Sequence, residues 1–234
     1  MTRSYSDARL ALYTAAVLVC ALLWESSGLD LAMATLSGGA TGFALRDHWL
    51  LTDVMHQGAR LLAWVFMLAL SLGLWWPRGP LRRLNWSERL QLVLSGWLAV
   101  LVVSLLKGMS ATSCPWDLQQ FGGVARYLPH WQGFLMSDGG GGHCFPGGHA
   151  SAGFAFVGGF FAFRRQAPEL ALRWLAVAVA VGLILGLGQQ LRGAHFMSHT
   201  LWSGLFCWLS AWGLDLLWRA AAALRRPLPQ PLGH

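Results

Sequence analysis

The feature that most constrains the fold is a series of long apolar stretches without a charged residue. Six such stretches follow one another along the chain: Leu10–Trp24, Leu61–Pro77, Leu90–Leu106, Ala150–Phe163, Trp174–Leu191 and Thr200–Leu214. None shows the alternation of period two that a membrane β-strand requires, so each is predicted to be a helix. Several are shorter than the roughly 20 residues of a transmembrane helix, but neighbouring apolar residues and snorkelling arginines extend such segments. We therefore predict an all-α integral membrane protein with six transmembrane helices.

The composition agrees with a membrane protein and argues against nucleic acid as a partner. Charged residues make up 12% of the 234 residues, and the mean hydropathy is +0.47. An average soluble domain carries about twice that charged fraction. The net charge of +7 comes from basic residues in short clusters between the apolar stretches. Membrane lipids are the expected partners, and we predict one domain over residues 1–234 without a cleavable signal peptide.

The basic residues also predict the orientation, because Lys and Arg favour the cytoplasmic side of a membrane. With the N-terminus inside, five basic residues face outward: Arg46, Arg60, Lys107, Arg126 and Arg192. The inner side then holds Arg3, Arg9, Arg78, Arg82, Arg83, Arg89, Arg164, Arg165, Arg173, Arg219, Arg225 and Arg226. Both termini are predicted to be cytoplasmic, and segments 25–60 and 108–149 to face outward. Segment 25–60 is expected to contain an interfacial helix, and residues 220–234 to form a flexible tail.

Three motifs fall at the outward ends of the predicted helices. They are KGMSATSCP, which begins at Lys107, FPGGHAS at 145–151, and GQQLRGAHFMSH at 188–199. In order and separation they resemble the motifs K-x6-R-P, P-S-G-H and S-R-x5-H-x3-D of the type 2 phosphatidic acid phosphatase (PAP2) superfamily, which also includes vanadium haloperoxidases. The resemblance is to its bacterial membrane lipid phosphatases and covers a core of about residues 61–216. It implies a six-helix core and a phosphatase that uses neither a metal nor another cofactor.

The resemblance assigns the site position by position. The matching residues are Lys107, Pro115, Pro146, Gly148 and His149. At the positions that differ, the family has Arg, Ser, Arg and Asp where this chain has Cys114, Gly147, Gln189 and His199. His195 takes the place of the nucleophilic histidine, and Arg192, three residues from both Gln189 and His195, would reach the position that Gln189 leaves uncharged. A second register would make His199 the nucleophile and put Ser203 at the Asp position.

These residues suit phosphoryl transfer, which needs neutralised phosphate oxygens and an in-line nucleophile. Lys107 and Arg192 are expected to supply positive charge, and Gln189 is expected to bind the same phosphate. The backbone N–H groups of Gly147 and Gly148 open a helix whose dipole favours an anion. By the resemblance, His195 forms a phosphohistidine and His149 acts as general acid and base. His199 is expected to orient His195, with Asp117 or Asp138 as alternatives for that role.

The four cysteines divide into two pairs. Cys20 and Cys207 fall within predicted helices and are expected to be packing residues. Cys114 and Cys144 fall in an outward segment, each beside a motif, where an oxidising compartment permits a disulfide. We expect these two to be bonded, the alternative being two free thiols. His195 and His199, four residues apart, also have the spacing of zinc ligands, but no acidic third ligand lies near them in the sequence.

The leading functional prediction is a membrane lipid phosphatase or phosphotransferase. Its substrate would be an outward-presented lipid phosphate or diphosphate, such as undecaprenyl diphosphate, phosphatidylglycerol phosphate, phosphatidic acid or lipid A. It is expected in the bacterial inner (cytoplasmic) membrane, with the active site facing the periplasm. Because motif Arg and Asp residues are replaced, the alternative is a non-catalytic lipid-binding or lipid-transport protein on the same scaffold.

Overall fold

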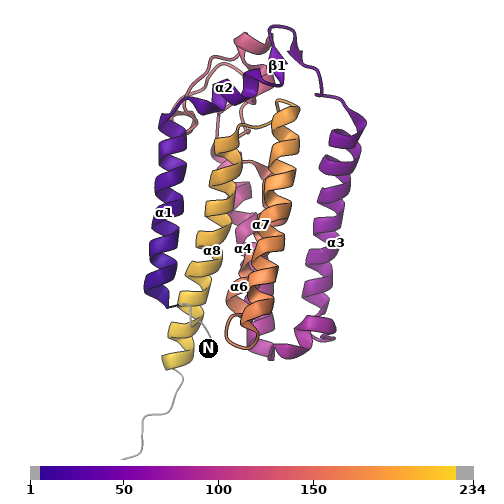
Figure 1. Ribbon diagram of the computed structural model, residues 1–234, viewed down its shortest axis with the longest axis vertical. Coiled ribbons are helices and arrows are strands. Elements are labelled where there is room, and N and C mark those ends of the chain that lie inside the picture. Colours follow the sequence, from indigo (N-terminus) through magenta and orange to yellow (C-terminus); the bar gives the residue numbers. More distant parts are fainter. Residues whose placement is uncertain (1–5, 225–234) are drawn as a thin grey trace, which may run out of the picture.

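The computed structural model describes residues 6–224, and every predicted apolar stretch lies within a helical segment, apart from the end of one. The long helices run along a common axis (Figure 1). The long helices are α1 (Asp7–Ser26), α3 (Ala59–Leu72), α4 (Trp86–Met109), α7 (Pro168–Leu191) and α8 (Met197–Leu224), and the short helices α5 (Gly148–Phe154) and α6 (Gly158–Phe163) follow one another between α4 and α7 in the chain. The prediction of an all-α membrane protein is therefore confirmed at this level.

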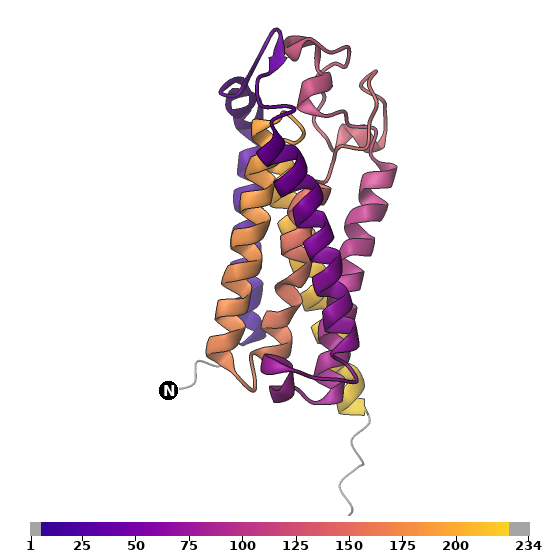
Figure 2. The same ribbon diagram turned by 90° about the vertical axis from the view of Figure 1, so that its right-hand side faces the viewer.

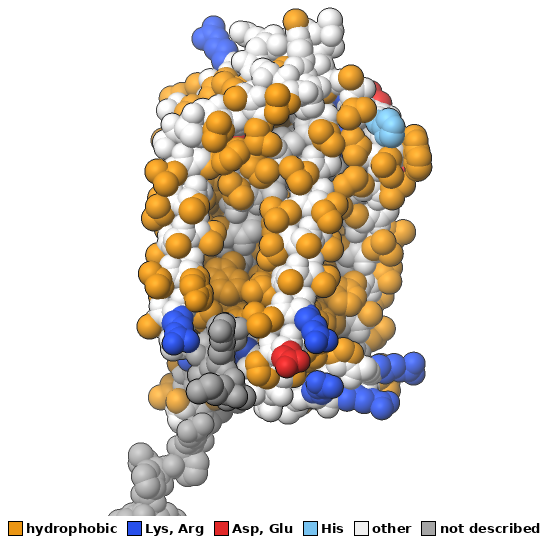
Figure 3. Space-filling model, viewed as in Figure 1, with side chains coloured by type: hydrophobic (Ala, Val, Ile, Leu, Met, Phe, Trp, Pro, Cys, Tyr) orange, Lys and Arg blue, Asp and Glu red, His pale blue; other side chains and the backbone are white. Residues whose placement is uncertain are grey.

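Four helical segments are long and apolar enough to cross a membrane: Asp7–Ser26, Leu50–Leu72, Trp86–Met109 and Pro168–Leu191. The apolar segment Gly148–Phe163 is shorter. It consists of α5 and α6 with the single 3₁₀ turn η6 (Ala155–Val157) between them. These features describe a multi-pass membrane protein, while the number of six crossings stays a prediction. Figure 3 shows apolar side chains covering the outer faces of the helices, where lipid would lie.

Two predicted boundaries were wrong. The second apolar stretch does not continue as a helix to Pro77, because α3 ends at Leu72 and a turn follows. The C-terminal tail does not begin at residue 220, because α8 continues to Leu224. The rest of the predicted tail, residues 225–234, lies outside the described residues.

Small residues allow the central helices to approach closely. A methyl group added to Gly153 of α5 would lie 2.3 Å from the backbone nitrogen of Gly182 in α7, and one added to Gly186 would lie 2.3 Å from Thr200 of α8. Glycine and other small residues serve this purpose where membrane helices pack. Phe160, Phe161 and other apolar side chains of α5–α6 are buried in the main core. The motif-bearing helices are thereby fixed against one another.

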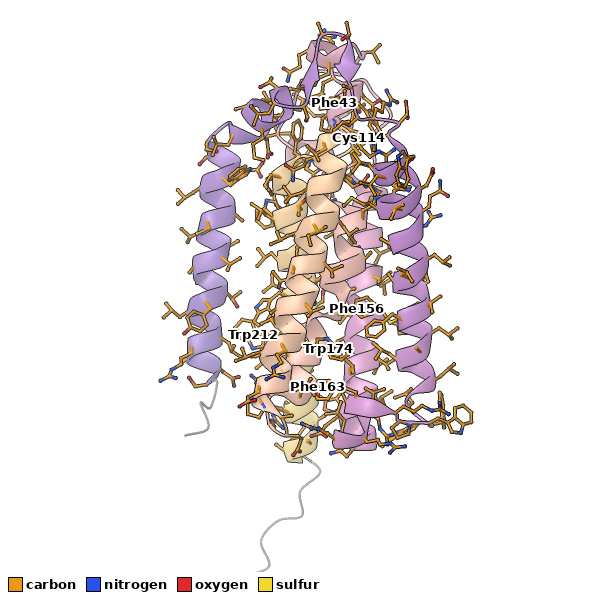
Figure 4. All side chains as sticks on the ribbon, turned by 45° about the vertical axis from the view of Figure 1, so that its right-hand side comes forward. Phe43, Cys114, Phe156, Phe163, Trp174 and Trp212 are labelled. Carbon is orange, nitrogen blue, oxygen red and sulfur yellow. A yellow bond between two sulfur atoms is a disulfide. The ribbon has the colours of Figure 1, made fainter. Side chains whose placement is uncertain are left out.

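A cap of shorter elements covers one end of the bundle (Figures 1 and 2). It contains α2 (Leu29–Thr35), a hairpin of β1 (Gly38–Gly39) and β2 (Gly42–Phe43), and the one-turn 3₁₀ helices η3 (Pro115–Asp117), η4 (Gln119–Phe121) and η5 (Gln132–Phe134). Figure 4 places Phe43 and Cys114 in this cap, far along the bundle from Phe163.

Segment 25–60, which is expected to contain an interfacial helix, includes a helical stretch that is joined to the bundle, and the interfacial position stays a prediction. Residues Leu50–Gly58 form a π-helix, η1, that continues directly into α3, so that Leu50–Leu72 is one helical segment. π-helical turns inside α-helices occur frequently at functional sites. This one brings the side chain of His56 into the bundle, as described below.

The opposite end of the bundle carries the 3₁₀ helix η2 (Gly79–Arg83) and a network of ion pairs. Asp215 accepts hydrogen bonds from Gln91 (3.0 Å), Arg164 (2.6 Å) and Arg219 (3.0 Å). Arg219 also donates two hydrogen bonds to Asp7. The network connects α1, α4 and α8 with Arg164, directly after α6. Basic side chains gather at this end in Figure 3, as the predicted orientation requires, although the side of the membrane stays a prediction.

Candidate active site

Lys107 lies in the last turn of α4, beside the first residue of α5. A methyl group placed on Gly148 would be 4.0 Å from the Lys107 ammonium nitrogen. Both the ammonium group and the helix N-terminus attract an anion. The first and second motifs therefore meet at one electropositive point, at the cap end of the bundle.

Three imidazole rings lie next to this point. The centres of the His149 and His195 rings are 6.2 Å apart. His56, from the π-helical segment, stacks on His149 with ring centres 3.9 Å apart. The charges of Lys107 and Arg192 are both near enough to act on His149 electrostatically. The structure thus brings together four predicted site residues, Lys107, His149, Arg192 and His195, from three motifs.

His195 lies in the short connection between α7 and α8, and its Nδ1 faces its predicted orienting partner. The distance from His195 Nδ1 to His199 Nδ1 is 3.4 Å, and the Cys144 sulfur is 3.6 Å from the same nitrogen. With Nδ1 held in this way, Nε2 is the nitrogen left to act as a nucleophile. Burial lowers the pKa of His195 well below its usual value, and the positive charge of Lys107 lowers it further. A neutral imidazole is the form that can attack phosphorus.

The arrangement around His199 favours the first register. Ser203, the residue that the second register puts at the Asp position, donates to the backbone carbonyl of His199 at 2.7 Å. Its hydroxyl therefore bonds to backbone and not to a histidine ring. His199 itself is 0% exposed, which suits a supporting residue better than a nucleophile that must meet substrate.

Arg192 occupies the position inferred for it beside Gln189. It donates to Gln189 Oε1 at 3.1 Å and to the backbone carbonyl of Arg46 at 2.8 Å. Its guanidinium also lies over the Trp116 ring, 5.7 Å from the ring centre. Gln189 is fully buried, so it holds the arginine in place. Its amide nitrogen Nε2 is buried without a hydrogen-bond partner among the described residues, so the predicted role of Gln189 in binding phosphate stays a prediction.

Three predicted roles need correction. The N–H of Gly147 already donates to the His199 carbonyl at 3.2 Å, so it secures α8 and is not free for phosphate. Asp138 accepts from the Ser113 N–H (2.6 Å) and hydroxyl (2.7 Å), and Asp117 accepts from the Cys114 N–H (3.3 Å). Both carboxylates therefore order the loop around the first motif, and neither orients His195.

Cys114 and Cys144 form a disulfide with their Cα atoms 5.2 Å apart. The bond joins the segment after Lys107 directly to the segment before His149. Cys144 is 0% exposed and its sulfur touches His195. The residue that replaces the motif arginine thus fixes the geometry of the site and contributes no charge.

The same contacts bear on the zinc alternative. Among the described residues, ligand atoms of Cys144, His195 and His199 lie within 4.8 Å of one another. A thiolate is the form of cysteine that binds a metal, and the Cys144 sulfur is already bonded to Cys114. The cluster thus fits a pair of hydrogen-bonded histidines better than a metal site.

Sequence reasoning missed three residues that border the site: His56, His130 and Glu25. His130 Nε2 lies 2.9 Å from Glu25 Oε2, and the His130 ring meets the His199 ring edge to face. His56 could have been found from the apolar residues of 50–58, because they continue the helical pattern of α3 towards the N-terminus. Glu25 is the acidic residue directly after the first apolar stretch, a position at which a charge has ordinary structural explanations.

Comparison with known proteins agrees with this geometry. The sequence model of the PAP2 superfamily matches residues 88–223, more than half of the chain. The chain belongs to the PAP2 superfamily. Neither a curated protein nor a solved structure matches it. Members of the PAP2 superfamily hydrolyse phosphate esters, which agrees with a site of cations and histidines.

The matched region of this PAP2 protein begins within α4, so it contains all three motifs but not the first 87 residues. Those residues nevertheless reach the site. Glu25, Arg46 and His56 each contact a residue at the site or beside it. The N-terminal part of the chain therefore supplies its own contribution to a site that the family places on the later helices.

Proposed function

We propose that this PAP2 protein is a membrane lipid phosphatase or phosphotransferase acting on an outward-presented lipid phosphate or diphosphate. One observation carries the lipid part of the proposal: a cavity of about 170 Å³ between α3, α4 and α5 that has a basic end and an apolar end. Arg60 and Lys107 line it near the cap, and Met67 and Val100 line it about two helical turns further from the cap. A lipid phosphate would fit this cavity, with its phosphate at the basic end and the start of its hydrocarbon chain at the apolar end.

In the proposed reaction, the substrate phosphate binds between Lys107 and Arg192, at the N-terminus of α5. His195 Nε2 forms a bond to phosphorus as the bond from phosphorus to the leaving oxygen breaks, and His149 gives that oxygen a proton. This produces a phosphohistidine and a protonated leaving group, which is the lipid alcohol for a monophosphate and the lipid monophosphate for a diphosphate. In the second step His149 takes a proton from water, or from the hydroxyl of an acceptor, and the N–P bond breaks. The identity of the acceptor decides between hydrolysis and transfer.

The predicted orientation completes the proposal. The basic end of the bundle lies opposite the cap, so the positive-inside rule puts the cap and the site on the outer side of a bacterial inner membrane. Undecaprenyl diphosphate, phosphatidylglycerol phosphate, phosphatidic acid and lipid A all present phosphate at such a surface. A substrate would reach the cavity laterally from the bilayer.

A panel of these lipids, incubated with purified protein in detergent with and without a chelator, tests the proposal. We expect phosphate release or transfer with at least one lipid, unchanged by the chelator and lost in His195→Ala. The matched control is His48→Ala, because His48 is exposed in the cap and is not one of the site residues. Release that persists in His195→Ala contradicts the mechanism.

The alternative, a non-catalytic lipid-binding or lipid-transport protein, is favoured by Gln189 and His199 at positions where the family has Arg and Asp. The same panel separates the two functions. Binding of a lipid phosphate, without phosphate release by the wild-type protein, would support the alternative and overturn the proposal of an enzyme.

A further inference from the structure

A histidine and an arginine from the segment Leu50–Leu72 lie beside the proposed phosphate pocket and have no part in the reaction described above. His56 stacks on His149, with ring centres 3.9 Å apart. Arg60, four residues further along the chain, lines the cavity of about 170 Å³ together with Lys107. The charge of Arg60 also acts on His56 electrostatically. The two side chains therefore border one region next to the pocket.

Contacts with α7 fix where His56 lies. Met55 of the π-helical segment packs over Gly188 of α7, and a methyl group added to that glycine would lie 2.5 Å from Met55 Cε. A glycine at this position thus lets the two helices approach closely, as small residues do where membrane helices pack. The position of His56 over His149 is therefore built into the packing of the bundle.

Arg60 and Lys107 are cations without a counter-charge in the part of the chain that the structure describes. Neither forms an ion pair with any residue between 6 and 224. Arg60 is also the only Lys or Arg in Leu50–Leu72. Ionisable side chains within membrane-spanning segments are costly, and where they occur they commonly mark a binding function. Anionic groups of a ligand would supply both counter-charges.

The walls of the cavity match the order of groups in a lipid diphosphate. Lys107 is half-buried beside the N-terminus of α5, where the reacting phosphate is proposed to bind. Arg60 is exposed on the α3 wall, and Met67 lies at the apolar end, about 10 Å further along the same helix. A terminal phosphate, a second phosphate and a hydrocarbon chain would occupy these three places. A monophosphate would leave Arg60 without an anion.

We propose that Arg60, assisted by His56, binds the second phosphate of a lipid diphosphate, so that the protein prefers diphosphates to monophosphates. This inference rests on the proposed function and makes its substrate class more specific. A guanidinium group can bind phosphate through two parallel hydrogen bonds, and a neutral imidazole adds one N–H donor. Both residues precede the region matched by the family model, residues 88–223, so the subsite is supplied by another part of the chain.

The contact between His56 and His149 puts this subsite on the side of the leaving group. His195 Nε2 bonds to the terminal phosphorus while the bond from that phosphorus to the bridging oxygen breaks. The bridging oxygen keeps the electron pair and takes a proton from His149, so the lipid monophosphate leaves. Its phosphate is the group that Arg60 holds, and the guanidinium stabilises the negative charge that develops there.

Two ligands with the same hydrocarbon chain test the subsite without turnover. Farnesyl diphosphate and farnesyl monophosphate are titrated by calorimetry into His195→Ala protein in detergent. We expect the diphosphate to bind more tightly, and Arg60→Met should reduce this preference about tenfold or more, as the loss of a hydrogen bond to a charged group does. Arg60→Lys keeps the charge and should keep most of the preference.

Two further variants separate a subsite from other effects. Arg126→Met removes an exposed cation of the cap that does not line the cavity. It controls for the general attraction of a more highly charged ligand, and the preference should stay unchanged. His56→Phe keeps an aromatic ring against His149 but removes the N–H donor, so it should reduce the preference by a smaller factor than Arg60→Met.

The outcomes separate this inference from the proposed function. An equal loss of affinity for both ligands in Arg60→Met overturns the subsite, and an arginine that only anchors α3 at the membrane surface would give this result. An equal loss of preference in Arg126→Met overturns it as well. Wild-type turnover without a preference for diphosphates keeps the enzyme and rejects the subsite. A preference that depends on Arg60, in a protein that releases no phosphate from any lipid, supports the subsite and rejects the enzyme.

Discussion

At the scale of single residues, the proposed mechanism depends on which of the two neighbouring histidines is the nucleophile. His195 keeps Nε2 available, whereas His199 is fully buried and turns its Nδ1 to His195. We expect His195→Ala to abolish turnover. His199→Ala should lower kcat by no more than roughly 10⁴-fold, the loss seen when the orienting partner of a catalytic histidine is impaired. Steady-state kinetics on the best lipid of the panel measures both values, and the reverse result would shift the assignment by one helical turn.

The pH dependence of activity reports on the same residue. His195 must be neutral to attack, and burial followed by the charge of Lys107 lowers its pKa well below the usual 6.5. A lowered pKa keeps the imidazole neutral as the pH falls, so the acid limb of kcat/KM attributable to His195 should lie below pH 6.5. Lys107→Met removes the charge and should move that limb to higher pH while raising KM. A limb at or above pH 6.5 in the wild type would contradict this environment.

At the scale of secondary-structure elements, a disulfide holds the end of α4 close to the start of α5. The Cys114–Cys144 bond spans 30 positions and closes a loop between the ends of α4 and α5. Removing it with Cys144→Ser should lower the free energy of unfolding by about 2–5 kcal/mol, and it should also lower kcat because the sulfur touches His195. Thermal unfolding and turnover before and after reduction measure the effect. Cys207→Ser, at a buried thiol outside the site, controls for the loss of a sulfur.

Helices and motifs could be predicted from the sequence because their signals are local. Apolar runs located every long helix, and motif spacing brought Lys107, His149 and His195 to one site. The helical stretch Leu50–Gly58, which runs directly into α3, was missed because the polar residues of segment 25–60 suggested a surface position. The engagement of Gly147 with His199 depends on how α5 meets α8, and the pairing of Glu25 with His130 depends on the fold of the cap. Neither contact leaves a pattern in the sequence.

At the scale of the whole molecule, the two ends of the bundle have different tasks. The cap end gathers Lys107, His149, Arg192 and His195, together with contributions from the N-terminal part of the chain. The far end holds the ion pairs around Asp215 and many of the basic residues. Lys and Arg favour the cytoplasmic side of a membrane. The proposed orientation therefore puts the basic end inside and the proposed active site outside. Because long helices separate the two ends, we expect substitutions in the ion-pair network to leave the site at the cap end unchanged, and the reverse.

Asp215 provides the test of that separation. It is 2% exposed and accepts from Gln91, Arg164 and Arg219. Asp215→Asn leaves Arg164, whose side chain is 7% exposed, without its main counter-charge. Breaking a buried pair in this way typically costs about 3–5 kcal/mol, so we expect a large fall in the unfolding free energy in detergent.

The matched control for Asp215→Asn is Glu169→Gln, because the Glu169–Arg173 pair is largely exposed and should contribute little to stability. For the protein that remains folded, kcat and KM of Asp215→Asn should equal those of the wild type, since the proposed active site lies at the other end of α8. A fall in kcat at full stability would show instead that α8 transmits changes from the ion-pair network to His199, and through it to His195.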